Sequence, residues 1–320
     1  GPRTKADYPY SYDPLLVYAT GEQADGSVYS DRFRMWYYAC HTGVNPDWPE
    51  KLKAQAARWK EDVIPGPLCY AESLDGVHWV KPKLGQLLFK GSRENNALDL
   101  PSALTGDACV VRDDSDPVPE RRYKLAYWSQ YDPFEFPTMH LATSADGLHW
   151  QAAAAPPISS FLEHCSLYRF DGRFFANSQT LASPQNGESP MRVGTAWMSL
   201  DFDHWLPESV QSFALPWQVD PVRDEVHLGV APYAYPNVLV GLYCRWHNRP
   251  NFGEISGDLG LVVSNDGLTF REPEKGRVWL RARNRCSCRT SRPSRGRRTS
   301  CPRRASTRSS SAASSERCLP

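Results

Sequence analysis

The chain has 320 residues, which is enough for one large domain or two ordinary ones. Its formal net charge of +1 conceals two parts of opposite sign, because residues 281–320 contain 12 Arg, no Lys and one acid. Residues 1–280 therefore carry a net charge of −10. This argues against a nucleic-acid partner, whose binding depends on neutralising phosphates. No apolar run is long enough to cross a bilayer, so no membrane partner is predicted.

Strand-forming runs recur from residue 15 to residue 280, and one segment between them has helical spacing. In residues 46–62, Asp47 can act as an N-cap, Pro49 can open a helix, and apolar residues follow at i, i+4 and i+7, which predicts a short surface helix. The runs fall into units, with strands expected at 15–18 and 34–40, at 106–113 and 123–128, at 163–170 and 173–176, and at 226–231 and 238–244.

A short motif follows a strand run four times. It reads Ser-x-Asp-Gly-x-His-Trp at 73–79 and at 144–150, and it returns in looser form at 199–205 and 264–270. The Asp-Gly pair can supply the positive φ angles of a type I′ turn or a Gly bulge, and the Ser and Asp side chains can bond the backbone N–H groups of the turn. We predict four hairpin turns that build the fold and carry no chemistry.

The spacing of the motif predicts the architecture. Its closing aromatic residues are 71, 55 and 65 residues apart, and each unit offers about four strands. Repeats of this size and strand content are typical of β-propeller blades. We therefore predict an all-β fold, with one β-propeller at residues 8–280. Residues 1–7 are interpreted as a leader, because Gly1-Pro2 without an initiator Met is typical of a protease cleavage scar.

Residues 281–320 differ abruptly from the rest of the chain. They consist largely of Arg, Ser, Pro and Cys, without aromatic residues or hydrophobic periodicity. Two interpretations are open: a disordered basic tail, or a reading-frame error that interrupts a fifth unit barely begun at 277–280. Under either interpretation the fifth blade is truncated and the tail has no predicted function.

Four segments carry a family resemblance: Tyr70 to Pro82, Leu84-Gly85, Glu94-Asn95-Asn96 and Arg122-Tyr123-Lys124-Leu125. On these segments the chain resembles the five-bladed β-propeller glycoside hydrolases, the superfamily of invertases, levanases, arabinanases and β-xylosidases, and most of all bacterial family-32-like proteins. The resemblance covers about residues 8–280. It implies a five-bladed propeller and an enzyme that hydrolyses a glycosidic bond in a carbohydrate substrate. The invertase motifs Asn-Asp-Pro-Asn-Gly and Arg-Asp-Pro are absent, which argues against invertase-type fructoside chemistry.

The resemblance also implies the catalytic residues. In these relatives, three carboxylates from the inner strands of the first three blades meet at the propeller axis, in the chain order Asp, Asp, Glu. The matching positions here are Asp13 as base or nucleophile, Asp107 as the residue that tunes the acid and positions the sugar, and Glu163 as general acid. Glycosidases need one protonated and one ionised carboxyl group. The apolar neighbours of Glu163 favour its protonated form. The competing interpretation of Asp13 and Asp107 is ordinary turn residues.

Further residues near the predicted inner strands are candidates for substrate binding. They could hydrogen-bond sugar hydroxyls or stack on a sugar ring, although such His residues are also common in satisfied cores. The candidates are His164, His227, Trp128 and Arg245, with Asp224 or Glu225 as a reserve acid.

No metal or cofactor is predicted, because no His/Asp cluster has metal-ligand spacing and no Gly-rich phosphate loop or Ser-nucleophile elbow occurs. Five cysteines lie singly in apolar runs and are expected to be buried free thiols (Cys40, Cys69, Cys109, Cys165 and Cys244). We expect a soluble protein, from the bacterial cytoplasm or exported with its signal removed.

Two other functions stay open. The first is a non-catalytic carbohydrate-binding propeller. The second is a glycoside phosphorylase, which needs a cationic pocket for phosphate that Arg112, Arg245 and Arg249 could supply.

Overall fold

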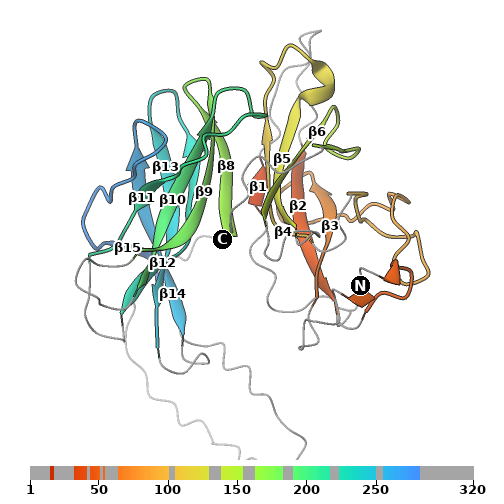
Figure 1. Ribbon diagram of the computed structural model, residues 1–320, viewed down its shortest axis with the longest axis horizontal. Helices are drawn as coiled ribbons and strands as arrows, with labels where there is room; N and C mark the ends of the chain where they lie inside the picture. Colours follow the sequence, from red (N-terminus) through yellow and green to blue (C-terminus); the bar gives the residue numbers. More distant parts are fainter. Residues whose placement is uncertain are drawn as a thin grey trace, which may run out of the picture. The chain divides into compact units, whose positions relative to one another are not determined.

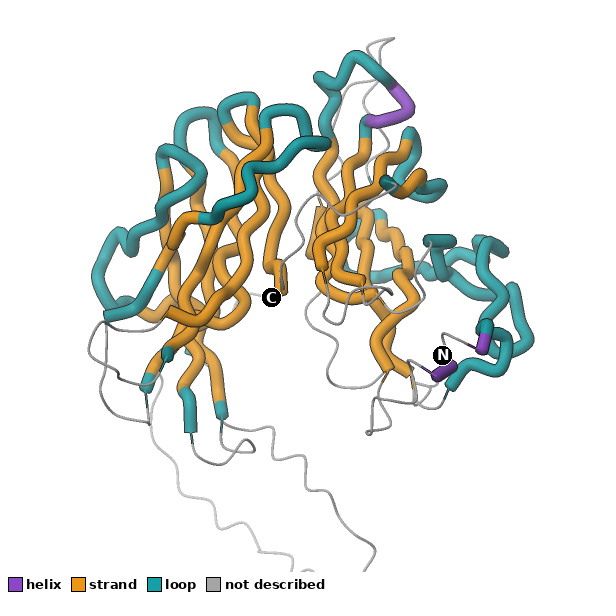
Figure 2. The backbone as a smooth tube through the Cα atoms, in the orientation of Figure 1, coloured by secondary structure: helices purple, strands orange, loops and turns teal. Residues whose placement is uncertain are grey.

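The computed structural model is all-β with almost no helix, and its strands form antiparallel sheets (Figure 1). It describes residues 15–17, 32–41, 44–50, 53–54, 64–100, 105–129, 138–153, 163–182, 190–216, 223–249 and 255–281. In this part of the chain four sheets follow one another, and in each sheet the strands pair in chain order as a meander (Figure 2).

Sheet 1 has three strands and sheets 2, 3 and 4 have four each. Sheet 1 consists of β1 (Leu15–Val17), β2 (Phe33–His41) and β3 (Ile64–Ser73). Sheet 2 consists of β4 (Thr105–Arg112), β5 (Tyr123–Ser129), β6 (Thr138–Ser144) and β7 (Gln151–Ala152), with a 3-10 turn, η1 (Pro119–Arg121), before β5. Sheet 3 consists of β8 (Glu163–Phe170), β9 (Arg173–Ala182), β10 (Met191–Ser199) and β11 (Val210–Phe213). Sheet 4 consists of β12 (Asp224–Ala234), β13 (Leu239–His247), β14 (Ser256–Ser264) and β15 (Val278–Leu280).

The predicted strands are confirmed, with one correction at the end of sheet 4. Residues 277–280 were expected to begin a fifth unit. Instead, β15 pairs antiparallel with β14 and completes sheet 4 as its fourth strand. The sequence could not distinguish the two cases, because a three-residue apolar run fits either a first or a last strand.

The predicted helix is present where the structure describes it. Residues 53–54 are helical, and the Lys53 N–H donates to the Pro49 carbonyl at 3.0 Å, so the helical turn begins at Pro49. The rest of the 46–62 segment lies outside the described residues. Within the described ranges, no helix has the length and apolar character needed to cross a membrane.

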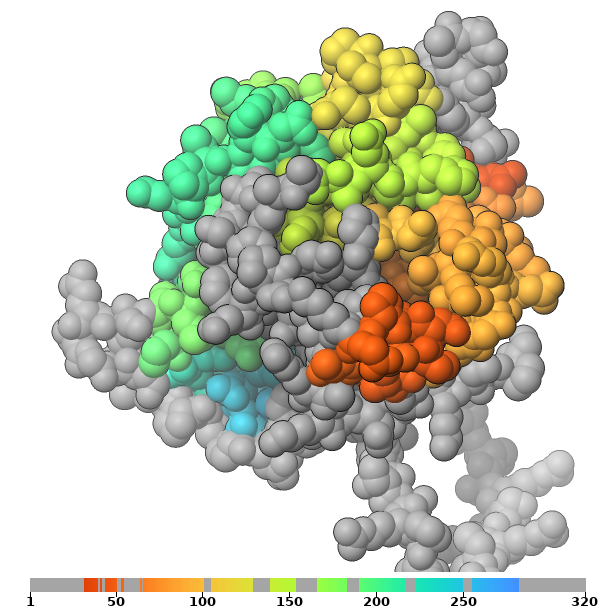
Figure 3. Space-filling model, turned by 45° about the vertical axis from the view of Figure 1, so that its right-hand side comes forward, coloured from red at the N-terminus to blue at the C-terminus, as the bar shows by residue number. Residues whose placement is uncertain are grey.

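This helical segment rests on the loop that follows β3. Asn45 and Asp47 accept hydrogen bonds from the backbone N–H groups of Lys90 and Gly91, at 3.1 and 2.6 Å. Figure 3 shows the two segments side by side on the surface. The contact closes one end of sheet 1.

The hydrophobic core consists of three clusters, each between consecutive sheets. Neighbouring residues of one strand point into different clusters, because side chains alternate across a strand. Leu125 packs toward sheet 1 and Ala126 toward sheet 3, while Phe174 packs toward sheet 2 and Phe175 toward sheet 4. All four are at most 4% exposed. Burial on both faces explains why the sequence shows continuous apolar runs and not strict alternation.

The four motif copies form turns that link the third strand of each sheet to its short fourth strand or bridge. In the first copy, the Ser73 hydroxyl accepts from the Gly76 N–H at 2.9 Å. The Asp75 carboxylate accepts from the N–H groups of Val77 and His78 at 2.8 and 2.7 Å. The same bonds recur at the other three copies. The structural role is confirmed.

Of the two predicted geometries, a type I′ turn or a Gly bulge, the structure excludes the type I′ turn, because that turn needs two consecutive residues with positive φ. Here the Gly alone is left-handed, at +74° to +80° in Gly76, Gly147 and Gly267. The third copy has Phe202 at this position, with φ +75°. The Asp before it does not have a positive φ, and the hydrogen bonds of its side chain hold it in the turn.

Candidate functional site

The first strands of sheets 2, 3 and 4 each carry a β-bulge close to their start. The pairing register shifts within 106–109 of β4, 164–166 of β8 and 227–230 of β12. A bulge leaves residues without a pairing partner and redirects their side chains. Four predicted site residues lie at or next to these bulges: Asp107, Glu163, His164 and His227.

The bulges of sheets 3 and 4 are held side by side by buried polar groups. The Ser166 hydroxyl donates to the Val230 carbonyl at 2.6 Å, and the Asn177 side chain accepts from the Val230 N–H at 2.8 Å. Gly229, at φ +109°, permits this approach. A Cβ atom there would lie 2.4 Å from Asn177 Oδ1 and 2.5 Å from the Ser178 carbonyl oxygen. The two first strands are therefore in contact just beyond their bulges.

A second link joins Glu163 to His227 through the backbone. Glu163 pairs with Gln179 across β8 and β9. The side chain of Gln179 accepts from the N–H of Leu228 at 2.8 Å, and Leu228 directly follows His227. The predicted acid position and the predicted binding histidine are thus brought to the same end of sheets 3 and 4.

Asp107 occupies the bulge of β4 and adopts a left-handed conformation, with φ +45°. Asp tolerates this region better than most residues do. Cys109 and Leu167, which directly follow the bulges of β4 and β8, pack in the same cluster. The strands β4 and β8 therefore contribute to the same part of the core beyond their bulges.

Trp128 of β5 lies beside the bulge of β4. It pairs with Gly106, and a Cβ atom on Gly106 would lie 3.3 Å from its ring. At 8% exposure the ring presents little surface for a sugar to stack on. A contact between Trp128 and substrate remains a prediction.

The structure does not test the predicted catalytic roles of Asp13, Asp107 and Glu163. The backbone of Glu163 and His164 begins β8, but their side chains lie outside the described atoms. Asp13 lies outside the described residues altogether. Their catalytic and binding roles stay predictions.

His227 is described in full, and it brings in two residues that the sequence did not indicate. Its ring stacks against Trp246 with the centroids 4.0 Å apart, and its Nδ1 lies 2.9 Å from Arg192 Nη1. A guanidinium can only donate, so Nδ1 accepts and the neutral ring carries its proton on Nε2. Burial, and then the charge of Arg192, lower the pKa of His227 to about 4. At neutral pH His227 is therefore an uncharged hydrogen-bond donor.

Both reserve acids are already engaged. Glu225 is 4% exposed and lies 3.0 Å from the guanidinium of Arg223. Asp224 lies 2.6 Å from Nδ1 of His247, whose Nε2 lies 3.1 Å from Asp258. The sequence missed His247 and Asp258, because each belongs to a different strand and their contact depends on the register of sheet 4.

The arginines considered for a phosphate pocket have other partners. Arg245 lies 3.2 Å from Glu272, and Arg112 lies 2.7 Å from Asp114. Arg249 donates to a neighbouring backbone carbonyl. Arg245 and Arg112 are thus neutralised within the protein, which weakens the phosphorylase interpretation. Substrate binding by Arg245 stays a prediction.

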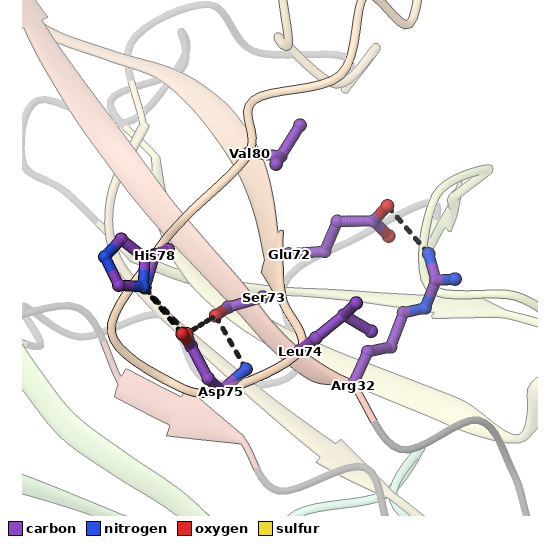
Figure 4. Close-up of a pocket in the computed structure, with 7 residues that line it drawn as sticks. All are labelled: Arg32, Glu72, Ser73, Leu74, Asp75, His78 and Val80. Carbon is purple, nitrogen blue, oxygen red and sulfur yellow. Dashed lines mark hydrogen bonds and ion pairs between the residues drawn. The ribbon is translucent and has the colours of Figure 1, made fainter.

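A cavity of about 380 Å³ lies at the opposite end of sheet 1, beside the first motif turn (Figure 4). Here Arg32 holds Glu72 at 2.7 Å, and hydrogen bonds from His78 and Val77 lower the pKa of Asp75. Asp75 is therefore poorly suited to donate a proton, and Glu72 is engaged in an ion pair. The cavity is lined by Arg32, Glu72, Ser73, Leu74, Asp75, His78 and Val80.

In the described ranges no group of three or more His, Cys, Asp or Glu residues is arranged to hold a metal ion. The described side chains at or beside the bulges include the carboxylate of Asp107, the neutral imidazole of His227 and the guanidinium of Arg192.

Comparisons with known proteins identify the fold. No protein-family model matches the chain. Over 139 residues it is 31% identical to an uncharacterized protein of Mycobacterium tuberculosis, a match that covers 43% of this chain and 35% of that protein. The chain thus spans about a third of the length of this curated relative.

Two solved structures are similar at low sequence identity. A candidate glycoside hydrolase from Parabacteroides distasonis has a TM-score of 0.52 and 14% identity over 85% of this chain and 74% of its own. A candidate glycosidase from Bacteroides thetaiotaomicron has a TM-score of 0.50 and 12% identity over 82% and 71%. The chain therefore has a glycoside hydrolase-like fold, and its antiparallel sheets are consistent with a β-propeller-like form of that fold.

Proposed function

We propose that this protein is a glycoside hydrolase built on a five-bladed β-propeller, and that it cleaves a glycosidic bond at the end where the first strands of the sheets begin. The observation that supports this is the β-bulge near the start of the first strand in each of sheets 2, 3 and 4, in β4, β8 and β12. Bulges are common next to active sites because they redirect side chains out of the sheet. The two similar solved structures are glycoside hydrolase-like proteins, which agrees with this chemistry.

In this proposal Glu163 is the general acid, Asp13 the base or nucleophile, and Asp107 the residue that tunes the acid and positions the sugar. Three carboxyl groups that share one site cannot all ionise freely, so the affinity of one for its proton must rise. Glu163 is the best candidate because it is followed by the apolar, buried stretch of β8. His227 would contribute its Nε2 proton to a sugar hydroxyl.

The experiment uses aryl glycosides of several sugars, with good and poor leaving groups, on the purified chain. A good leaving group scarcely needs protonation, whereas a poor one does. Glu163→Gln should lose about 10²–10⁴-fold in kcat/KM on poor leaving groups and much less on good ones. Asp13→Asn should abolish turnover of both kinds of substrate.

Glu208→Gln is the matched control, because Glu208 is exposed and lies in the loop before β11. Equal losses on both leaving groups in Glu163→Gln would remove Glu163 from the acid role. Full activity in both site variants would move the site elsewhere. Sugar binding without hydrolysis of any glycoside would favour a non-catalytic carbohydrate-binding propeller.

A further inference from the structure

Arg192 differs from the other partly buried arginines of sheets 3 and 4. In the described part of the chain its partners are the neutral ring of His227, at 2.9 Å, and the face of Trp246, 5.4 Å from the ring centroid. By contrast, Arg223 and Arg245 lie 3.0 and 3.2 Å from buried glutamates. The charge of Arg192 is therefore not neutralised by any carboxylate that the structure describes.

The arrangement leaves hydrogen-bond donors of Arg192 and His227 without a partner among the described residues. One N–H of Arg192 is used on His227, and its remaining guanidinium N–H groups are available. His227 keeps its Nε2 proton, for which no partner occurs among the described residues. Trp246 contacts both side chains and fixes their relative position. All three residues are half-buried, so a ligand can reach them.

We propose that Arg192 and His227 form a subsite for the carboxylate of an acidic sugar, so that the substrates are glycans containing a uronic acid. This inference rests on the proposed function, because it assumes that the end of the sheets where β12 begins receives a carbohydrate. The link from His227 through Leu228 and Gln179 to the backbone of Glu163 puts the subsite beside the proposed catalytic acid. The three strands that carry it, β10, β12 and β13, are marked in Figure 1.

The surrounding charges favour a carboxylate over a phosphate ester. Arg192 supplies a single positive charge, which matches the single negative charge of a uronate, and its planar fork suits two parallel hydrogen bonds to a carboxylate. A doubly charged phosphate would leave one negative charge that Arg192 does not match.

The test measures binding by calorimetry on the full chain, without turnover. The probes are the methyl glycosides of glucuronic and galacturonic acid and of their neutral counterparts, glucose and galactose. We expect at least one uronide to bind more tightly than its neutral counterpart. Arg192→Gln should weaken that uronide about 10- to 100-fold, the range expected for lost charge-assisted bonds, and leave the neutral sugar within about twofold.

Arg271→Gln is the matched control, because Arg271 is exposed on sheet 4 and bonds only Asn265 among its charged or polar side-chain neighbours that the structure describes. It should bind both sugars like the parent protein. Arg192→Lys keeps the charge and should keep part of the uronide preference, which provides a second variant if Arg192→Gln fails to fold. Thermal unfolding of each variant establishes that it is folded.

Three results would overturn the subsite: equal binding of uronide and neutral sugar by the parent protein, unchanged uronide binding in Arg192→Gln, or competition by inorganic phosphate as strong as that by the uronide. The two proposals fail separately. Charge-selective binding without hydrolysis would retain the subsite and reject the hydrolase. Hydrolysis of neutral glycosides alone would retain the hydrolase and reject the subsite.

Discussion

Replacing Gly229 by Ala tests the contact that aligns the bulges of sheets 3 and 4. Gly229 has φ +109°, which L residues rarely adopt, and holding Ala there costs about 1–3 kcal/mol. The new methyl group would lie 2.4 Å from Asn177 Oδ1, so β12 would have to move. Losing the buried Asn177 bond to the Val230 N–H adds about 1–3 kcal/mol. The total loss in the free energy of unfolding is about 4 kcal/mol.

Gly172→Ala is the matched control for this experiment. Gly172 also has a positive φ, +75°, but a Cβ atom there would have no neighbour within 4 Å. It therefore isolates the backbone strain of a left-handed Ala, about 1–2 kcal/mol. The larger loss of about 4 kcal/mol in Gly229→Ala corresponds, for a domain of this size, to a fall in Tm of about 8–16 °C.

The assay is urea and thermal unfolding of both variants beside the parent protein. Equal losses in Gly229→Ala and Gly172→Ala would refute the close approach of β12 to β8 and β9. A larger loss in Gly229→Ala, accompanied by weaker sugar binding, would agree with a site built on the aligned bulges.

Three further predictions concern stability. The folded-state pKa of His227 is about 4, below its ordinary value, so the unfolded chain binds more protons between about pH 4 and 6.5. The contribution of His227 to the free energy of unfolding should be fully present above about pH 6.5 and should fall by up to about 3 kcal/mol on acidification to pH 4. His227→Leu should remove that part of the pH dependence, measured by urea unfolding at each pH. Asp116→Asn leaves Lys124, which is 1% exposed, without its nearest carboxylate, and should cost about 3 kcal/mol by urea unfolding. Asp171→Asn, at the exposed pair of Asp171 with Arg173, should cost under about 1 kcal/mol. Phe202→Gly relieves about 1–2 kcal/mol of left-handed backbone strain but removes a fully buried ring worth about 3–5 kcal/mol. The Tm should therefore fall, and a rise in Tm would show that the strain dominates.

The sequence predicted the local structure well because local signals determine it. Runs of β-branched and aromatic residues ended at Ser-x-Asp-Gly, and each third strand ends at the Ser of that motif. The hydrogen bonds that make the turn lie within six residues, so no distant contact can override them. The error at residues 277–280 has the opposite cause, because the place of β15 depends on pairing with β14.

The site could be predicted only where its residues lie near the start of a first strand. Asp107 and His227 were predicted in this way, and the structure places both at bulges that the sequence indicates only by nearby glycines. Arg192 and Trp246 could not be found, because they lie on other strands and meet His227 through register and twist. No spacing rule within one strand reports such a contact.

The acids of the motif turns explain why we propose the catalytic site at the bulges and not at the turns. In the motif turns, burial opposes ionisation, but hydrogen bonds from His149 and Leu148 outweigh it and lower the pKa of Asp146 to about 2. The same balance lowers the pKa of Asp201 to about 2. These carboxylates stay ionised at neutral pH, because the hydrogen bonds of the turn stabilise their charged form, and they are poor proton donors. A general acid therefore has to be a carboxyl group whose hydrogen bonds are not used to form a turn. The unpaired residues of a bulge meet that condition.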